Sequence, residues 1–143
     1  MGIFDFVKDA GARIIENASD AAGAIMGHVN KEVPESKNSD VEVEYSDGTV
    51  KVSGNAASQA DKEKIILAAG NVHGVSKIDD NIKVAGGEQK QSRMYTVKSG
   101  DTLSKIAKEM YGNAGDYPRI FEANRPMLSD PDKIYPGQVL RIP

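Results

Sequence analysis

The chain has 143 residues, enough for one domain or two small ones. Its 21 acidic and 18 basic side chains give a net charge of −3, which disfavours a nucleic-acid partner because the phosphate backbone requires a basic surface. The absence of cysteine excludes disulfides and thiolate chemistry, and no apolar run approaches the roughly 18 residues of a membrane span. The first residues lack the basic and then apolar pattern of a secretory signal, so we expect a cytoplasmic protein without stable membrane insertion.

Residues 1–19 are predicted to form an N-terminal amphipathic helix. The prediction rests on aliphatic residues at helical spacing: Ile3, Val7, Ala10, Ile14 and Ile15. Gly11 interrupts the pattern, and a glycine either weakens a helix or ends it. Acidic and basic side chains are balanced here, whereas a helix on a membrane surface usually has a polar face rich in lysine and arginine. We therefore expect this helix to pack on the domain that follows.

Residues 20–86 show the pattern of an α+β domain. A helical pattern is followed by two alternating segments joined at Asp47-Gly48, a strong signal for a tight turn. Ser58 is the expected N-cap of a further helix, which Gly70 is expected to end. A last strand has aliphatic residues on one face: Ile78, Ile82 and Val84. The order helix, hairpin, helix, strand predicts a sandwich in which helices cover one face of a sheet.

The glycines and aliphatic residues of this region resemble a BON domain. The likeness rests on the segment from Gly48 to Gly54 and on the segment from Gly74 to Val84. It implies the BON fold and an association with phospholipids or the cell envelope. The glycines also have structural explanations, because turns and positive φ angles favour this residue.

A polar segment at residues 87–93 is the expected linker to a second domain, residues 94–143. The second domain has the pattern strand, helix, helix, strand. Asp101 is placed to cap its first helix, and its second helix is expected over residues 117–124. Pro136-Gly137 predicts a type II turn before the last strand. The segments YTVKSGDTLSKIA and IYPGQVLRIP make this region resemble a LysM domain, a βααβ fold, over its whole length.

LysM domains usually bind polymers of N-acetylglucosamine, so the resemblance implies a glycan groove. In this family the groove lies between the loop before the first helix and the loop before the second strand. The matching residues here are Gly100, Asp101, Thr102, Leu103, Met127, Leu128 and Ile134. Helix capping is the structural alternative for Asp101 and Thr102.

The whole sequence resembles a family of small bacterial cytoplasmic proteins that bind potassium ions. The likeness combines a short apolar beginning, one BON domain and one C-terminal LysM domain. It implies selective binding of K⁺, compaction on binding and a role in sensing potassium. We expect a monomer, and a protein partner for the ion-bound form is left open.

A K⁺ site leaves few side-chain signals, because backbone carbonyl oxygens can replace the water shell of this weakly hydrated ion. Carbonyl oxygens without partners occur at helix ends, where the helix dipole is also negative, and at glycine turns. The exit from the second BON helix and the stretch around Gly11 fit this description. We expect a cage made by the carbonyl oxygens of Val7, Ala10, Ala12, Gly70, Val72 and Val75. Ordinary helix ends are the structural alternative.

Side chains for catalysis or for other metals are nearly absent. His28 and His73 are far apart in the sequence and lack the context of a zinc site. Asp79 and Asp80 lack EF-hand spacing and are better explained as solvated charges at a sheet edge. We therefore expect a binding protein and not an enzyme. Two hypotheses follow: a cytoplasmic K⁺ sensor or buffer, and an envelope protein that binds peptidoglycan and phospholipid.

Overall fold

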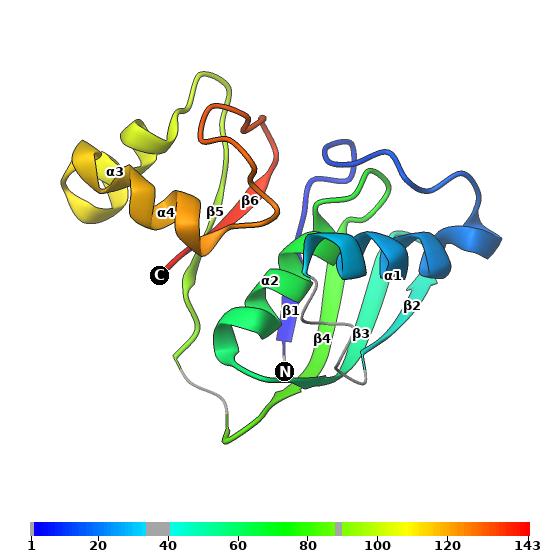
Figure 1. The fold of residues 1–143 in the computed structure, drawn as a ribbon. Helices are drawn as coiled ribbons and strands as arrows, with labels where there is room; N and C mark the ends of the chain where they lie inside the picture. Colours follow the sequence, from blue (N-terminus) through cyan, green and yellow to red (C-terminus); the bar gives the residue numbers. More distant parts are fainter. Residues whose placement is uncertain (1, 34–40, 88–89) are drawn as a thin grey trace.

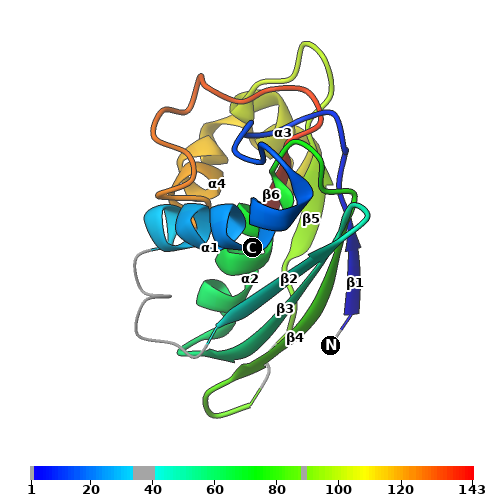
Figure 2. The same cartoon turned by 90° about the vertical axis from the view of Figure 1, so that its right-hand side faces the viewer.

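The computed structural model describes residues 2–33, 41–87 and 90–143, and it contains two sheets (Figure 1). The first is a four-stranded sheet in the order β1-β4-β3-β2, and helices α1 and α2 cover one of its faces (Figure 2). The predicted order of helix, hairpin, helix and strand in an α+β domain is confirmed. The elements of this half are β1 (Gly2–Asp5), α1 (Ala21–Glu32), β2 (Glu42–Ser46), β3 (Thr49–Ala56), α2 (Gln59–Gly70) and β4 (Lys77–Val84).

The second half has the expected order of strand, helix, helix and strand. Its antiparallel sheet contains two strands, and the linker predicted at residues 87–93 includes residues 88–89, which lie outside the described residues. A 3-10 turn at Ala18–Asp20 precedes α1, and a 3-10 turn at Ala114–Asp116 precedes α4. The main elements are β5 (Arg93–Thr96), α3 (Leu103–Tyr111), α4 (Tyr117–Ala123) and β6 (Val139–Ile142).

The N-terminal helix predicted for residues 1–19 is wrong. Strand β1 occupies Gly2–Asp5, and within the described residues no α-helix precedes α1. Ile3 is 60% exposed and Val7 is 43% exposed, so the residues chosen by helical spacing do not share a buried face. The side chains instead alternate between two faces as in a β-strand, because Phe4 packs against the core while its neighbour Ile3 is exposed. The free edge of β4 supplies a hydrogen-bonding partner that the local spacing could not reveal.

The turn and capping signals of the BON region are confirmed in part. Asp47 and Gly48 have φ angles of 47° and 82°, as the tight turn between β2 and β3 requires. Ser58 caps α2, since its Oγ accepts a hydrogen bond from the backbone N–H of Asp61 at 3.1 Å. Helix α2 ends at Gly70 as expected, but the glycine is needed for space and not for a positive φ. The ring of Phe6 occupies the volume that a Cβ would fill.

Asp79 and Asp80 do not lie at a sheet edge, because β1 pairs with the other side of β4. Asp80 is 2% exposed, and its Oδ2 lies 3.1 Å from the Nζ of Lys62 on α2. Its Oδ1 accepts a hydrogen bond from the backbone N–H of Ile82 at 2.9 Å. Asp79 lies on the opposite face of the strand and is half-buried. The prediction of solvated edge charges is therefore wrong for β4.

The two domains share an apolar contact. The BON core lies between the first sheet and its helices, and it includes one LysM residue, Val139. Met94 also packs against this core, and Met127 packs against the cores of both domains. The LysM core is formed mainly by α3, α4 and β6. The arrangement of the two domains is thus set by packing as well as by the chain that joins them.

Candidate functional site

The two segments predicted to supply carbonyl oxygens lie side by side. The loop of residues 7–12 follows β1, and the loop of residues 70–75 leaves α2. Ala12 forms an isolated parallel bridge with Val72. Further backbone hydrogen bonds join the loops: Ala12 N to Asn71 O at 3.1 Å, His73 N to Ala12 O at 2.9 Å, and Gly74 N to Lys8 O at 2.7 Å. The structure therefore brings together residues that are about sixty positions apart in the sequence.

The carbonyl oxygens of the predicted cage differ in their availability. Within the described residues, those of Ala10, Gly70 and Val75 accept no hydrogen bond. The others already accept backbone hydrogen bonds: Val7 from Ala10 at 3.1 Å, Val72 from Val75 at 3.0 Å, and Ala12 from both Ile14 and His73. A carbonyl oxygen has two lone pairs, so one hydrogen bond still leaves room for an ion. Ala12, which accepts two, is the least available of the set.

Two glycines with positive φ allow the backbone to come close at this place. Gly11 has a φ of 96°, and a Cβ there would collide with the backbone of Asn71. Gly137 lies in the LysM turn before β6 and has a φ of 88°. A Cβ on Gly137 would lie 2.7 Å from the Cβ of Ala10 and 3.3 Å from the Cβ of Val7. A third loop, from the LysM domain, therefore closes on the two carbonyl loops.

A cavity of about 260 Å³ lies beside this junction, and its wall includes Asn71 and the LysM residue Gln138. Of the six residues predicted to supply carbonyl oxygens, Ala12 alone lines it. Gln138 is 3% exposed, and its Oε1 is buried without a hydrogen-bond partner among the described residues. A buried oxygen without a partner is costly, and a cation or a donor would offset that cost. Gln138 therefore offers one neutral oxygen at a cavity that Glu32 and Lys133 also line.

Four titratable residues also line the cavity: His28, Glu32, Lys133 and Tyr135. Burial lowers the pKa of His28, and the nearby ammonium of Lys31 lowers it further, so the imidazole is neutral at pH 7. Burial raises the pKa of Glu32, while Lys31 acts in the opposite direction. Burial, with a smaller effect from Glu32, raises the pKa of Tyr135 to about 12. His28 therefore adds no positive charge beside the carbonyl loops.

Asn71 fastens the LysM domain to the end of α2. Its Nδ2 donates a hydrogen bond to the backbone oxygen of Val139 at 2.8 Å, and its Oδ1 accepts one from the N–H of Val139 at 2.8 Å. The two residues are 68 positions apart. Sequence reasoning missed this contact because an asparagine after a helix looks like an ordinary capping residue.

A buried ion pair forms the second connection. The Nε of Arg141 lies 2.8 Å from the Oε1 of Glu63, and Glu63 is 1% exposed. The Oε2 of Glu63 accepts hydrogen bonds from the backbone N–H of Ser92 and from the Nε2 of Gln59. Burial alone would raise the pKa of Glu63, but the hydrogen bonds from Gln59, Ser92 and Arg141 outweigh it and hold the pKa below its usual range.

The apolar residues of the predicted glycan groove take part in packing. Leu103 and Leu128 are each 2% exposed in the LysM core, and Ile134 packs partly against it. Met127 lies in the domain contact, where its sulfur accepts a hydrogen bond from Asn71 Nδ2 at 3.4 Å. The structure thus shows what these side chains stabilise, and glycan binding by them stays a prediction.

The polar residues of that groove stabilise the loop before α3. Thr102 caps α3, because its Oγ1 accepts a hydrogen bond from the backbone N–H of Lys105 at 3.1 Å. Asp101 does not cap the helix. Its Oδ2 instead accepts hydrogen bonds from the Tyr95 hydroxyl at 2.7 Å and from the N–H of Lys98 at 2.9 Å. The bond with Tyr95 is the main cause that lowers the pKa of Asp101 and raises that of Tyr95 to about 12. Gly100 has a positive φ of 86°.

The described part of the chain contains neither a membrane-spanning helix nor a cluster of metal-binding side chains. None of its helices combines the length and the apolar character that crossing a bilayer requires. Nor do three or more His, Cys, Asp or Glu side chains gather there in a group that could hold a metal ion.

Known proteins share this architecture. The BON domain family model matches residues 17–86, and the LysM domain family model matches residues 95–143. The chain is 49% identical over 150 residues to the potassium binding protein Kbp of Escherichia coli O6:H1, covering 100% of this chain and 99% of that protein. The chain belongs to the Kbp family. The order of BON and then LysM, predicted from the sequence, is confirmed.

Other relatives of this chain match it over a smaller share of their own length. An uncharacterized protein of Deinococcus radiodurans is 35% identical over 95% of this chain, which spans 56% of that protein. An esterase of Mycobacterium tuberculosis is 50% identical over 48 residues, only 10% of the esterase. So short a match carries no inference of esterase activity. BON and LysM are binding families and not enzyme families.

Proposed function

We propose that this protein is a cytoplasmic K⁺-binding protein that acts as a sensor or a buffer. The observation that carries the proposal is the meeting of loops 7–12 and 70–75, where three carbonyl oxygens accept no hydrogen bond within the described residues. The relative that is 49% identical over the full chain has the name potassium binding protein, which supports the choice of ion.

The proposed ligands are the carbonyl oxygens of Val7, Ala10, Ala12, Gly70, Val72 and Val75. Neutral carbonyl oxygens suit K⁺, whereas clustered carboxylates would favour Ca²⁺ or Mg²⁺. Ion binding would also favour a compact molecule. The loops around the proposed site come from the N-terminal segment, the BON domain and, through Gly137, the LysM domain.

Thermal unfolding in KCl, RbCl, NaCl and LiCl at matched ionic strength tests this proposal. A bound ion stabilises the folded state by RT ln(1 + [K⁺]/Kd), so the midpoint should rise by several degrees in K⁺ and Rb⁺ only. Equal midpoints in all four salts would overturn the proposal.

Two glycine substitutions give a matched pair. Gly11→Ala should abolish the response to K⁺, because the Cβ collides with the backbone of Asn71 and φ is positive. Gly27→Ala on α1 adds a Cβ in open space and should leave the response unchanged. A K⁺ response retained in Gly11→Ala would exclude the proposed cage.

The alternative is an envelope protein that binds glycan and phospholipid. It predicts binding of chitin oligomers or anionic vesicles and no effect of K⁺ on unfolding. It has less support, because Leu103 and Leu128 are core residues and Met127 is in the domain contact. The same protein sample, titrated with chitin oligomers, distinguishes the two functions.

A further inference from the structure

The outer edge of β6 is closed by two asparagine side chains. Asn71 exchanges two hydrogen bonds of 2.8 Å with the backbone N–H and C=O of Val139. Asn124 exchanges two of 2.9 Å with the same groups of Arg141. One N–H and the oxygen of each side-chain amide take the roles of the N–H and C=O of a peptide group, so these asparagines occupy the places of a neighbouring strand.

The outer edge of β5, on the other side of the same sheet, has no such cover among the described residues. In an antiparallel pair, alternate residues direct their backbone groups toward the partner strand. The N–H of Val97 donates to the oxygen of Gln138 at 2.8 Å, which fixes this alternation along β5. The backbone groups of Met94 and Thr96 therefore point away from β6.

Strand β1 has a similar free edge. It is the last strand on its side of the first sheet, and the N–H of Phe6 donates to the oxygen of Ser76 at 2.9 Å. By the same alternation, the backbone groups of Ile3 and Asp5 point away from β4. Each strand has four residues and one charged side chain, Asp5 in β1 and Arg93 in β5, and neither strand contains proline or lysine.

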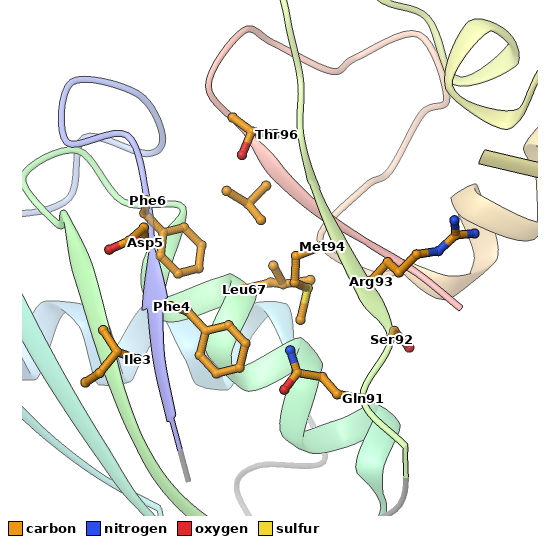
Figure 3. A pocket seen from close by; sticks show the side chains of 11 residues that line it. Ile3, Phe4, Asp5, Phe6, Leu67, Gln91, Ser92, Arg93, Met94 and Thr96 are labelled. Carbon is orange, nitrogen blue, oxygen red and sulfur yellow. The ribbon is translucent and has the colours of Figure 1, made fainter. Parts of the chain in front are cut away.

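The two free edges face one groove. Figure 3 shows β1 and β5 on its two sides, running in the same direction, with Phe4 and Met94 between them. The cavity is about 340 Å³, and Ile3, Asp5, Met94 and Thr96 all line it. Buried apolar residues that also form the contact between the domains close its inner side: Phe6, Leu67 and Val139. The groove is therefore continuous with the interface of the BON and LysM domains.

We propose that this groove binds an extended segment of a partner protein as an added β-strand. A segment running opposite to β1 and β5 would be antiparallel to both and could bond to the outward groups of Ile3, Asp5, Met94 and Thr96. Apolar side chains at every second position of the segment would meet the apolar inner side of the groove. The added strand would join the four-stranded and two-stranded sheets into one.

The probe is a synthetic peptide of eight residues, in which six alternating valines and threonines stand between two terminal lysines. The control has the same sequence with N-methyl groups on alternate residues, which removes the donors of one edge. Amide hydrogen exchange of the full chain, followed by NMR, should show at least tenfold protection of Ile3, Asp5, Met94 and Thr96 with the probe. Protection at only one edge, no saturable binding, or equal binding of the methylated peptide would overturn the proposal. Protection that grows with protein concentration without peptide would assign the groove to a second copy instead.

Proline variants test the role of the outward donors. Thr96→Pro removes an outward N–H while leaving the ladder with β6, and Ile3→Pro does the same on β1. Each should reduce peptide affinity at least tenfold, whereas Thr96→Val and Ile3→Val should bind as the parent does. Both side chains are exposed, so circular dichroism should show an intact fold. Unchanged affinity in the folded proline variants would contradict the proposal.

Discussion

Two neighbouring residues of α2 form buried ion pairs with different structural roles. Lys62 pairs with Asp80 inside the BON domain, and Glu63 pairs with Arg141 of the LysM domain. The N–O distances are similar, 3.1 Å and 2.8 Å, and all four side chains are at most 10% exposed. The first pair joins a helix to the sheet beneath it, while the second joins two domains. The comparison teaches that the consequence of breaking a buried pair depends on what the pair connects.

The largest effect is expected from Asp80→Ala. It leaves the ammonium of Lys62 without this carboxylate in the BON core, and removing one partner of a buried pair typically costs about 3–5 kcal/mol. We expect a lower urea midpoint for the BON domain. Asp79→Ala, on the opposite face of the same strand, is the control and should change stability by less than about 1 kcal/mol. Equal effects of the two variants would show that the Lys62 pair contributes little.

Arg141→Met should separate the domains without unfolding them. It leaves the buried carboxylate of Glu63 without its cation, at a cost of about 2–5 kcal/mol, and it also removes the hydrogen bond from Arg141 to the Ala123 oxygen within the LysM domain. Small-angle scattering should report a larger radius of gyration, with unchanged far-ultraviolet circular dichroism. Arg125→Met, which removes an exposed pair with Glu122, should leave the radius as it is. A compact Arg141→Met variant would show that apolar packing alone holds the domains together.

Substitution of the two asparagines that bind β6 also separates contacts between the domains from contacts within one domain, with smaller expected effects. Asn71→Ala leaves both backbone groups of Val139 without partners, at a cost of about 1–3 kcal/mol, and should weaken the domain contact. Asn124→Ala removes equivalent bonds to Arg141 within the LysM domain, so it should lower the stability of that domain. Hydrogen exchange measured domain by domain separates these outcomes. Identical exchange patterns in the two variants would contradict this assignment.

The smallest effect is the pH dependence of the interdomain pair. Hydrogen bonds hold the pKa of Glu63 below its value in the unfolded chain, so the folded state binds fewer protons in the acid range. The resulting stability is present at neutral pH and is lost as the pH falls through the acid range. The difference in urea midpoint between the parent protein and Glu63→Gln should therefore shrink from pH 7 to pH 3. A difference independent of pH would show that the Glu63 carboxylate contributes nothing by its charge.

Much of the fold could be predicted because its signals are local. The Asp47-Gly48 turn, the Ser58 cap and the alternation of Ile78, Ile82 and Val84 each depend on residues close in sequence. The N-terminal strand could not be predicted in this way. Its residues also fit helical spacing, and only the free edge of β4 selects the extended form.

The candidate site was predictable only in outline. Glycines and helix ends indicated two loops, which the structure brings together, but within the described residues only three of the six expected carbonyl oxygens accept no hydrogen bond. Nothing in the sequence indicated that Gly137 approaches Ala10, or that the Oε1 of Gln138 is buried without a hydrogen-bond partner among the described residues. These contacts join residues more than a hundred positions apart, and no local pattern encodes such distances.

The sequence by itself determined the two domains, their order and most of their helices and strands, because these follow from local periodicity, turns and caps. The tertiary structure decided which way Asp80 faces, how Glu63 reaches Arg141, and which strand edges are covered. The physical reason is that burial and ion pairing depend on what lies across the fold. The sequence does not distinguish a carboxylate that faces water from one that pairs with a buried cation.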